Sequence, residues 1–384
     1  MSRDWIHHNG VWLPLGGEPG TVTGGPAPGL TWVNPPTLSK AGLGTQTTVY
    51  SVANSLAAGS RVYAGLASAG DLTTWANIHE EHVQRFGNGN NSMWRGGSIS
   101  GQMAEWNGST GAYWEDTGLI DGNHYHGDTG FGITRALNCT IELLKVENCG
   151  DNIAFGKQGI SAALERLMGG SDGSVVRYCA LLRAGDDVVE NDWKDSITCY
   201  RNFMSGAMLI STRPGNGSEP ERTDTRNKIM RLDGNLMWRR GKRYRDLTSI
   251  NGVLGQKLAF NFFKWQTDGG TATPGPEYAM QCHMHNCILR TDGDPTQTGA
   301  TTSHWGTLLT SGPNNRLTAQ SNNWLLQPFA DSGYPPGWPV NDLPSFQGRY
   351  LYGAGAAAKW NAEANAWAAS HPELLMTTGD KGII

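Results

Sequence analysis

The sequence predicts an all-β protein, a single-stranded right-handed parallel β-helix with about 21 residues per coil, helical caps and a short N-terminal extension. Two observations predict this fold. Gly101 and Gly122 are 21 residues apart, Gly185 and Gly206 are again 21 apart, and intervals of 28 or 35 elsewhere fit the same repeat with an insertion. Short alternating apolar runs, such as IELLKVEN and VVRYCALLR, precede the glycines. Such repeats are typical of a solenoid.

Composition agrees with this fold class. Only 17% of the 384 residues are charged, the net charge is −4, and glycine is abundant at 52 residues, as in a turn-rich β protein. This balance argues against nucleic acid as the main partner. No apolar run is long enough to insert in a membrane, and the N-terminal MSRDWIHHNGVWLPLGG lacks the apolar segment of a signal peptide.

The chain divides into four parts. Residues 1–30 form an aromatic tip, with a hairpin turn expected at Asn9-Gly10, and a Gly/Pro linker. Residues 31–92 form a cap with a strand at SRVYAGL and a helix at LTTWANIHEEHVQRF. Residues 93–326 are the parallel β-helix, with a helical insertion at KQGISAALERLMGG. Residues 327–384 are an irregular segment and a capping helix at KWNAEANAWAAS, because an uncapped coil exposes apolar surface and strand edges.

The tryptophans and the cysteines could each have one of two structural roles. The 15 tryptophans either stack on sugars from an exposed face or fill the core. The six cysteines lie beside apolar residues, which favours free thiols inside the solenoid over disulfides.

Acidic residues recur beside the glycines. The glycine spacing places Asp151 one coil from Asp186, and Asn152 one coil from Asp187 with His124 beyond. Carboxylates this close repel one another, so that one holds a proton, as glycoside cleavage requires. The candidate catalytic residues are Asp186, Asp187, Glu190 and Asp151. The alternative is that these aspartates cap the backbone of turns.

Further residues in the same coils are candidates for substrate binding: Asp192, Trp193, Arg213, Lys264, His124 and His126. A hydrolase would use two carboxyl groups and no cofactor. A lyase would hold Ca²⁺ on the acidic side chains and use Arg213 or Lys264 as the base. No other metal or cofactor is expected.

A pair of histidines and a basic segment are two further candidate binding features. In YAMQCHMHNC, alternation places Cys282 and Met284 on one face and His283 and His285 on the other, without a third metal ligand. The segment RRGKRYR, beginning at Arg239, either clamps an acidic polysaccharide or is a solvated loop.

Several motifs resemble a known family. The motifs GDDVVENDW, ISTRP, NFFKW, MHNCILR, SNNWLL and KWNAEANAWAASHPE look like those of right-handed parallel β-helix (pectate-lyase-like) proteins of bacteria and phages, over about residues 118–373. GDDVVEND also resembles the Gly-Asp-Asp turn of polygalacturonases, whose other motifs are missing here. The N-terminal NGVW resembles the tips of phage tail and minor tail proteins. This resemblance implies the fold more than the chemistry.

These observations suggest a phage tail protein, of tailspike or minor tail type, located in the virion. It would bind host surface polysaccharide, depolymerise it if the acidic residues are catalytic, and contact other tail proteins through its tip. Viral β-helix proteins usually pack three faces about an axis, so a homotrimer is expected. The alternatives are a cellular polysaccharide lyase or hydrolase, cytoplasmic or exported without a classical signal, and a non-catalytic adhesin.

Overall fold

The structure is a computed structural model that describes the chain in segments. These are residues 5–8, 11–14, 61–65, 73–74, 82–87, 91–100, 129–134, 136–147, 149, 151–155, 171–191, 195–211, 228–239, 244–250, 253–257, 261–264, 281–292, 317–329 and 349–384.

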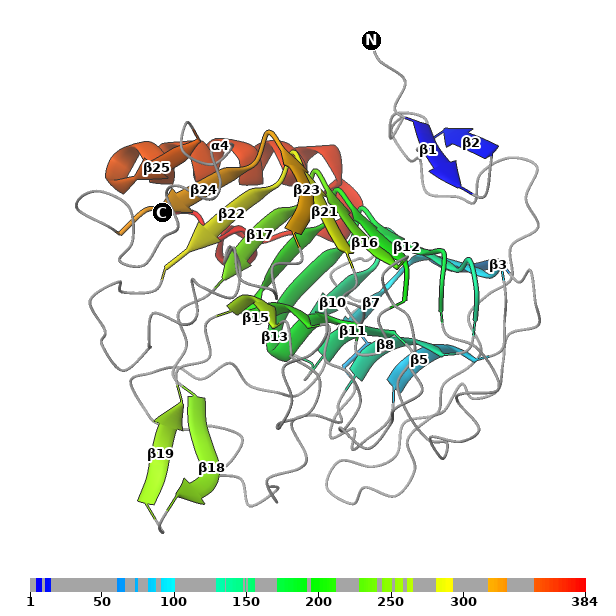
Figure 1. Ribbon diagram of the computed structural model, residues 1–384, viewed down its shortest axis with the longest axis horizontal. Coiled ribbons are helices and arrows are strands. Elements are labelled where there is room, and N and C mark those ends of the chain that lie inside the picture. Colours follow the sequence, from blue (N-terminus) through cyan, green and yellow to red (C-terminus); the bar gives the residue numbers. More distant parts are fainter. Residues whose placement is uncertain are drawn as a thin grey trace.

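Most of the described strands lie in two large sheets of parallel strands (Figure 1). The eight-stranded sheet contains, in chain order, β3 (Arg61–Gly65), β6 (Met93–Gly96), β9 (Thr140–Glu142), β12 (Ser174–Arg177), β14 (Ile197–Tyr200), β16 (Ile229–Asp233), β21 (Gln281–His285) and β23 (Leu317–Ser321). Neighbours in this sheet are also neighbours in that chain order.

The thirteen-stranded sheet has a main path and a branch. The main path consists of β4 (Thr73–Thr74), β7 (Ser98–Ser100), β10 (Lys145–Glu147), β13 (Ala180–Glu190), β15 (Phe203–Ser211), β17 (Leu236–Arg239), β22 (Ile288–Thr291), β24 (Trp324–Gln327) and β25 (Tyr350–Tyr352). The branch, here called the side row, consists of β5 (His82–Gly87), β8 (Thr129–Thr134), β11 (Asp151–Phe155), the ends of β13 and β15, and β20 (Asn261–Lys264).

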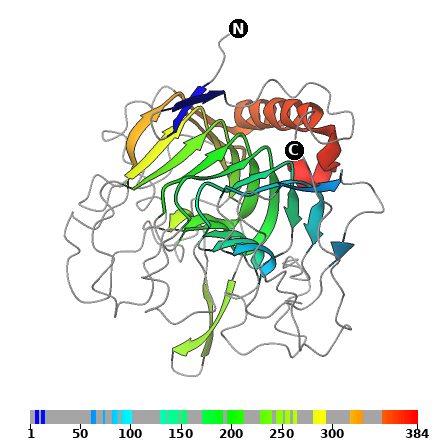
Figure 2. The same cartoon turned by 90° about the vertical axis from the view of Figure 1, so that its right-hand side faces the viewer.

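The chain visits the sheets in one repeated order. It passes from a strand of the eight-stranded sheet to one of the main path and then to the side row, as in β9, β10 and β11. β13 is long enough to belong to both the main path and the side row, because its start pairs with β10 and its end pairs with β11. Equivalent strands of successive passes therefore lie side by side, as Figure 2 shows. An all-β protein built mainly from parallel strands is confirmed.

The apolar core fills the space between these strands. In β16 the side chains of Met230 and Leu232 are buried, whereas the alternating residues Ile229, Arg231 and Asp233 are partly exposed. This is the period of two that a strand requires. Residues from both sheets and the side row, such as Trp94, Leu232 and Ile153, belong to one buried cluster. All six cysteines are buried and form no disulfides, as the sequence predicted.

A short corner recurs between the eight-stranded sheet and the main path. Its first residue has the left-handed backbone conformation, with φ between 49° and 65° at Leu143, Tyr178, Arg201, Gly234, Asn286 and Asn322. Its second residue is buried, and at three corners it is an asparagine: Asn202, Asn235 and Asn323.

These buried asparagines satisfy the backbone of the neighbouring corner. The Asn202 side-chain oxygen accepts from the Cys179 amide, and that of Asn235 accepts from the Asn202 amide, both at 2.9 Å. The Asn235 Nδ2 group donates to the Cys199 carbonyl at 2.8 Å. Buried backbone groups need such partners, so this asparagine ladder holds consecutive passes in register.

The C-terminal helix α4 (Gly353–Ser370) covers the outer side of the main path. Its alanine-rich sequence favours a helix, and the buried Trp360, Ala364 and Trp367 recur at i, i+4 and i+7 on one face. That face packs with Leu182, Phe203, Leu236, Ile288 and Leu326 from five strands of the sheet.

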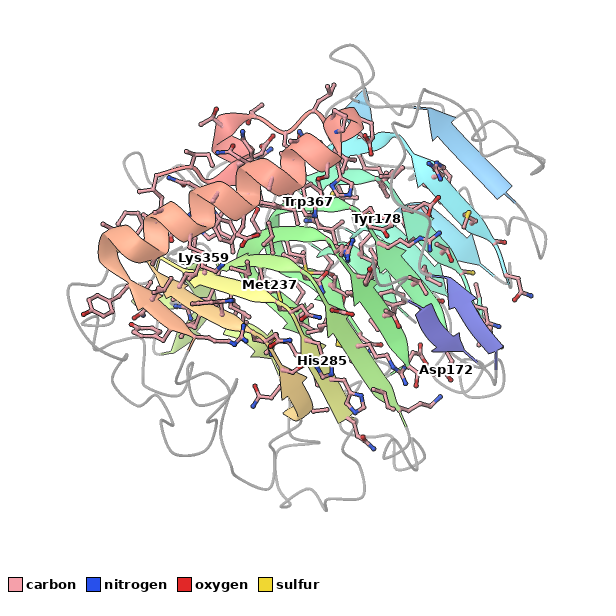
Figure 3. The ribbon with its side chains drawn as sticks, turned by 90° about the horizontal axis from the view of Figure 1, so that it is seen from above. Asp172, Tyr178, Met237, His285, Lys359 and Trp367 are labelled. Carbon is pink, nitrogen blue, oxygen red and sulfur yellow. The ribbon has the colours of Figure 1, made fainter. Side chains whose placement is uncertain are left out.

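Helix α4 therefore lies along the flank of the strand stack. Figure 3 shows it crossing above the strands, with Lys359 and Trp367 toward opposite ends. The sequence predicted a helix here correctly, but expected it to close an end of the β-helix. The wide aromatic stripe, with Trp360 completely buried, is better suited to a long flat sheet than to one terminal coil.

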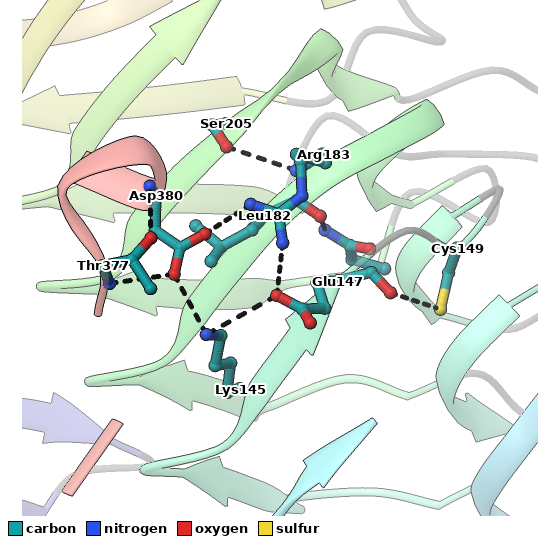
Figure 4. Close-up of polar contacts among 9 residues, drawn as sticks. Lys145, Glu147, Cys149, Leu182, Arg183, Ser205, Thr377 and Asp380 are labelled. Atoms are coloured by element: carbon teal, nitrogen blue, oxygen red, sulfur yellow. Dashed lines mark hydrogen bonds and ion pairs between the residues drawn. The ribbon is translucent and has the colours of Figure 1, made fainter. Parts of the chain in front are cut away.

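The chain then ends on the same sheet. After η4 (Pro372–Leu374), the short helix α5 (Thr378–Lys381) brings the buried Asp380 onto β10 and β13 (Figure 4). Asp380 contacts Lys145 at 3.1 Å and also pairs with Arg183, which itself pairs with Glu147. We call Lys145, Glu147, Arg183 and Asp380 the tail clamp.

Other sequence predictions are confirmed or corrected. The N-terminal hairpin is present, with β1 (Trp5–His8) antiparallel to β2 (Val11–Pro14) around the predicted Asn9-Gly10 turn. A second hairpin joins β18 (Tyr244–Ile250) and β19 (Val253–Lys257). The helix predicted through HVQRF is wrong, because His82–Gly87 is strand β5, paired in parallel with β8. The predicted helical insertion at 157–170 lies outside the described residues.

The glycine repeat is only partly right. Asp187 does lie opposite Met208, a step of 21 residues, but Gly206 lies opposite Arg239 and not near Gly234. Gly234 sits in a corner with φ +65°, where an added Cβ would approach Arg201 Cγ to 2.9 Å. No helix among the described residues is long and apolar enough to span a membrane.

Candidate functional site

The acidic residues predicted to be catalytic lie on the side row. The register pairs Ile153 with Val189 and Ala154 with Glu190, which sets Asp151 of β11 opposite Asp187 of β13. Thr129 of β8 lies opposite Asp151 on the other side, and Met208 of β15 lies opposite Asp187. Parallel pairing thus forms a column of residues across four strands, with two aspartates at its centre.

Asp151 and Asp187 are in direct contact. The backbone amide of Asp187 donates to Oδ1 of Asp151 at 3.2 Å, and both residues are only 1% exposed. A carboxylate that accepts a backbone N–H is stabilised in a defined orientation. The sequence had paired Asp151 with Asp186, one residue away. The difference arises because β13 contains one extra residue that the glycine spacing could not reveal: Lys145 pairs with Ala180, 35 residues later, whereas Ile153 pairs with Val189, 36 residues later.

Glu190 belongs to a neighbouring column of the same row. It is 5% exposed and lies opposite Ala154 on β11 and Ser211 on β15. Ser211 in turn lies opposite Lys264 on β20. Strands in a sheet are about 4.8 Å apart, so the backbones of Glu190 and Lys264 are separated by roughly 10 Å. The sequence placed both residues near one site, and the register places them two strands apart in one column.

The remaining predicted residues are not all described. Asp186 lies in β13, although its side chain falls outside the described part. The other predicted substrate-binding residues lie wholly outside it: Asp192, Trp193, Arg213, His124 and His126.

Asn152, between the two columns, behaves differently from its expected role. The sequence placed it one coil from Asp187, but its side-chain Nδ2 donates to the Leu182 carbonyl at 3.1 Å. The residue is completely buried, and its Oδ1 atom has no hydrogen-bond partner among the described atoms. Burying an unsatisfied oxygen costs about 1–3 kcal/mol, so this position conflicts with a purely structural optimum.

The side row thus carries two buried carboxyl groups, Asp151 and Asp187, on one face of adjacent strands, while Glu190 extends from the opposite face. Two carboxyl groups at such spacing can divide the roles of proton donor and charged partner, as glycan cleavage requires. The same groups can also cap the backbone, as Asp151 does. No group of three or more His, Cys, Asp or Glu side chains suited to a metal ion occurs in the part of the chain that the structure describes.

The histidine prediction on the eight-stranded sheet is confirmed. In β21 Cys282 and Met284 are buried, whereas His283 and His285 are partly exposed on the opposite face. His285 Nδ1 lies 2.7 Å from Ser321 Oγ, and His283 Nε2 lies 3.4 Å from Gln281 Oε1. Burial, Arg231 and His285 lower the pKa of His283, which favours its neutral form.

The basic segment RRGKRYR does not begin in a solvated loop. Arg239, at the end of β17, is 3% exposed and its Nη2 group donates to Thr291 Oγ1. Its guanidinium lies over the Phe262 ring, 5.6 Å from the centroid. Burial lowers the pKa of Arg239 to about 9, although Asp292 opposes that shift. Arg239 is therefore a core residue of the stack, and residues 240–243 lie outside the described part of the chain.

Sequence reasoning missed the asparagine ladder and the tail clamp. The ladder has a signal in the sequence, since RNF, GNL and NNW each follow a short alternating strand. The tail clamp has none, because Asp380 and Lys145 are 235 residues apart.

Comparisons of the chain with protein-family models, curated proteins and solved structures find no match in any of the three.

Proposed function

We propose that the chain is a single right-handed parallel β-helix that works as a virion-associated tail protein and cleaves host surface polysaccharide. The observation that carries the catalytic part is the position of Asp151 opposite Asp187 on adjacent strands of the side row, with both residues buried and the Asp187 backbone amide donating to the Asp151 carboxylate. The repeated passage through the eight-stranded sheet, main path and side row supports the β-helix. The N-terminal hairpin, followed in sequence by a Gly/Pro segment, supports attachment to other tail proteins.

In this proposal the side row is the floor of the active site. Residues opposite each other on adjacent strands, about 4.8 Å apart, extend from the same face, so both carboxyl groups are ionised only at an energetic penalty and one of them holds the proton that the leaving sugar oxygen requires. The other stays charged, oriented by the Asp187 amide. Glu190 lies three residues beyond Asp187 on β13, so strand alternation turns it, with the Lys264 column, to the opposite face of the side row.

The test is incubation of the purified protein with the envelope polysaccharide of candidate hosts. New reducing ends without unsaturated ends would identify a hydrolase, and unsaturated ends, detected by ultraviolet absorbance, would identify a lyase. Loss of lyase activity on chelation, with recovery on adding Ca²⁺, would show a calcium-dependent reaction. Binding of the polymer without new ends would contradict the catalytic part and leave an adhesin.

We also propose a homotrimer, as for viral β-helix proteins in general. A monomeric mass by light scattering at micromolar concentration would contradict it. A gene position away from tail-assembly genes would favour the cellular lyase or hydrolase.

A further inference from the structure

The outer face of the eight-stranded sheet carries a row of polar side chains separate from the side row. Alternation turns Arg231 and Asp233 of β16 and His283 and His285 of β21 away from the buried Met230 and Leu232. Register places Arg231 directly between Thr198 of β14 and His283. Figure 3 shows His285 on this side of the molecule, well away from helix α4.

Arg231 differs from the other arginines of this face. Arg95 and Arg177 both pair with Glu142, at 2.6 Å and 2.7 Å. The Arg231 side chain is half-buried and has no ion pair or hydrogen bond within the described part of the chain. Burial lowers the pKa of Arg231, and no carboxylate offsets that effect. A partly desolvated guanidinium without a counterion is poised to bind an external anion.

The surroundings of Arg231 supply donors and little negative charge. Thr198 and His283, on the two flanking strands, can each donate a hydrogen bond. The nearest carboxylate of the row, Asp233, is held by the Asn286 side chain at 2.8 Å and lies opposite His285. The guanidinium fork, a hydroxyl and an imidazole are groups that bind a carboxylate or phosphate.

We propose that Arg231, His283 and Thr198 form a subsite for an oxyanion, a carboxylate or phosphate, of an acidic surface polysaccharide. The subsite deepens the proposed glycan binding and rests on it for the polymer that carries the anion. Its position on a different face separates it from the acidic side row, where a second anion would be repelled. A polysaccharide bound at this subsite would be anchored while another segment of the same polysaccharide is cleaved at the side row.

Binding should strengthen as the pH falls through the range in which His283 protonates. The groups facing His283 are Arg231 and Asp233 on β16, Gln281 and His285 on its own strand, and Ala319 and Ser321 on β23. Arg231 and His285 oppose protonation of His283, and a bound anion would offset both.

The test follows the imidazole signals of the full-length protein by NMR, assigned with the variants His283→Gln and His285→Gln. Sodium glucuronate and sodium phosphate are titrated separately at constant ionic strength, with glucose as the neutral control. We expect saturable shifts of the His283 signal with one or both anions and none with glucose. Response to glucuronate alone identifies a uronic acid, and response to phosphate alone identifies a phosphorylated polymer.

Two variants decide whether the effect is local. Arg231→Gln should weaken binding at least about tenfold, the loss expected for a charge-assisted bond, and Arg231→Lys should weaken it less. Arg95→Gln removes the same charge from the same face. Glu142 would still pair with Arg177, so this variant should bind the anion as the wild type does. Equal weakening by Arg231→Gln and Arg95→Gln, or no saturable shift, would overturn the subsite. Neither outcome bears on cleavage at Asp151 and Asp187, which is measured as new sugar ends.

Discussion

Lys145 Nζ lies 3.1 Å from Oδ2 of Asp380, so a strand in the first half of the chain is joined to the last helix, 235 residues later. Both side chains are more than nine-tenths buried. Arg183 and Glu147 complete the tail clamp. The C-terminal segment is thus part of the folded body, and its removal would leave three charged groups buried without Asp380.

Replacing Asp380 with Asn should lower the free energy of unfolding by roughly 3 kcal/mol, because Lys145 and Arg183 would both remain buried with the single carboxylate of Glu147 between them. Urea denaturation measures the loss. The control is Glu363→Gln, which breaks the Lys359 pair on exposed helix surface and should change stability by less than about 0.5 kcal/mol. Similar effects of the two variants would contradict the importance of the tail clamp.

The tail clamp should also weaken in acid. Burial alone would raise the pKa of Asp380, but Arg183, the Thr377 amide and Lys145 outweigh it and lower the pKa to about 2. A lowered pKa means that this stabilisation is complete above about pH 4 and is lost as the pH falls toward 2. Its size is about 2 kcal/mol, from a change of nearly two pKa units. Thermal melts of wild type and Asp380→Asn should therefore converge between pH 4 and 2; a constant difference would refute the assignment.

The asparagine ladder predicts a large effect from a small change. Asn235→Ala leaves the Asn202 amide and the Cys199 carbonyl without partners in the core, and should cost roughly 2–4 kcal/mol. Asn365→Ala, on the exposed face of α4, should change stability by less than about 0.5 kcal/mol. Chemical denaturation compares the two, and equal stability of both variants would show that the ladder is dispensable.

The six thiols should be inert in the native protein. All are buried, and burial raises the pKa of Cys139 to about 11 and that of Cys179 to about 12, which removes the reactive thiolate. Ellman's reagent should release no colour from the folded protein and six equivalents in denaturant. Rapid reaction of any thiol under native conditions would contradict this packing.

Glycan cleavage should depend on the aspartate pair. Asp187→Asn and Asp151→Asn keep the shape and the acceptor for the amide, so each should lower cleavage by about 100-fold or more while the fold persists. Asp172→Asn, which alters an acidic residue in the turn before β12 that pairs with Lys228, is the matched control and should retain activity. Early melting of the aspartate variants, with activity surviving in the folded fraction, would show that the pair only caps the backbone.

Local patterns determined the features that the sequence predicted correctly. The Asn9-Gly10 turn identified the hairpin, alternation separated His283 and His285 from the core, and tryptophan and alanine spacing identified helix α4. Each depends on residues within one or two turns of chain. The parallel, all-β character followed from the repetition of such strands.

Only the tertiary structure decided which residues meet. Asp151 lies opposite Asp187, and not Asp186, because β13 contains one more residue between its pairing with β10 and its pairing with β11 than the earlier pass does. HVQRF is a strand because β8 offers a pairing edge, which outweighs the local pattern. Asp380 reaches Lys145 because α4 has an apolar face to bury along the sheet. Strand register and the packing of a helix on a sheet depend on contacts between segments far apart in the sequence. A local sequence pattern does not specify which distant segments meet.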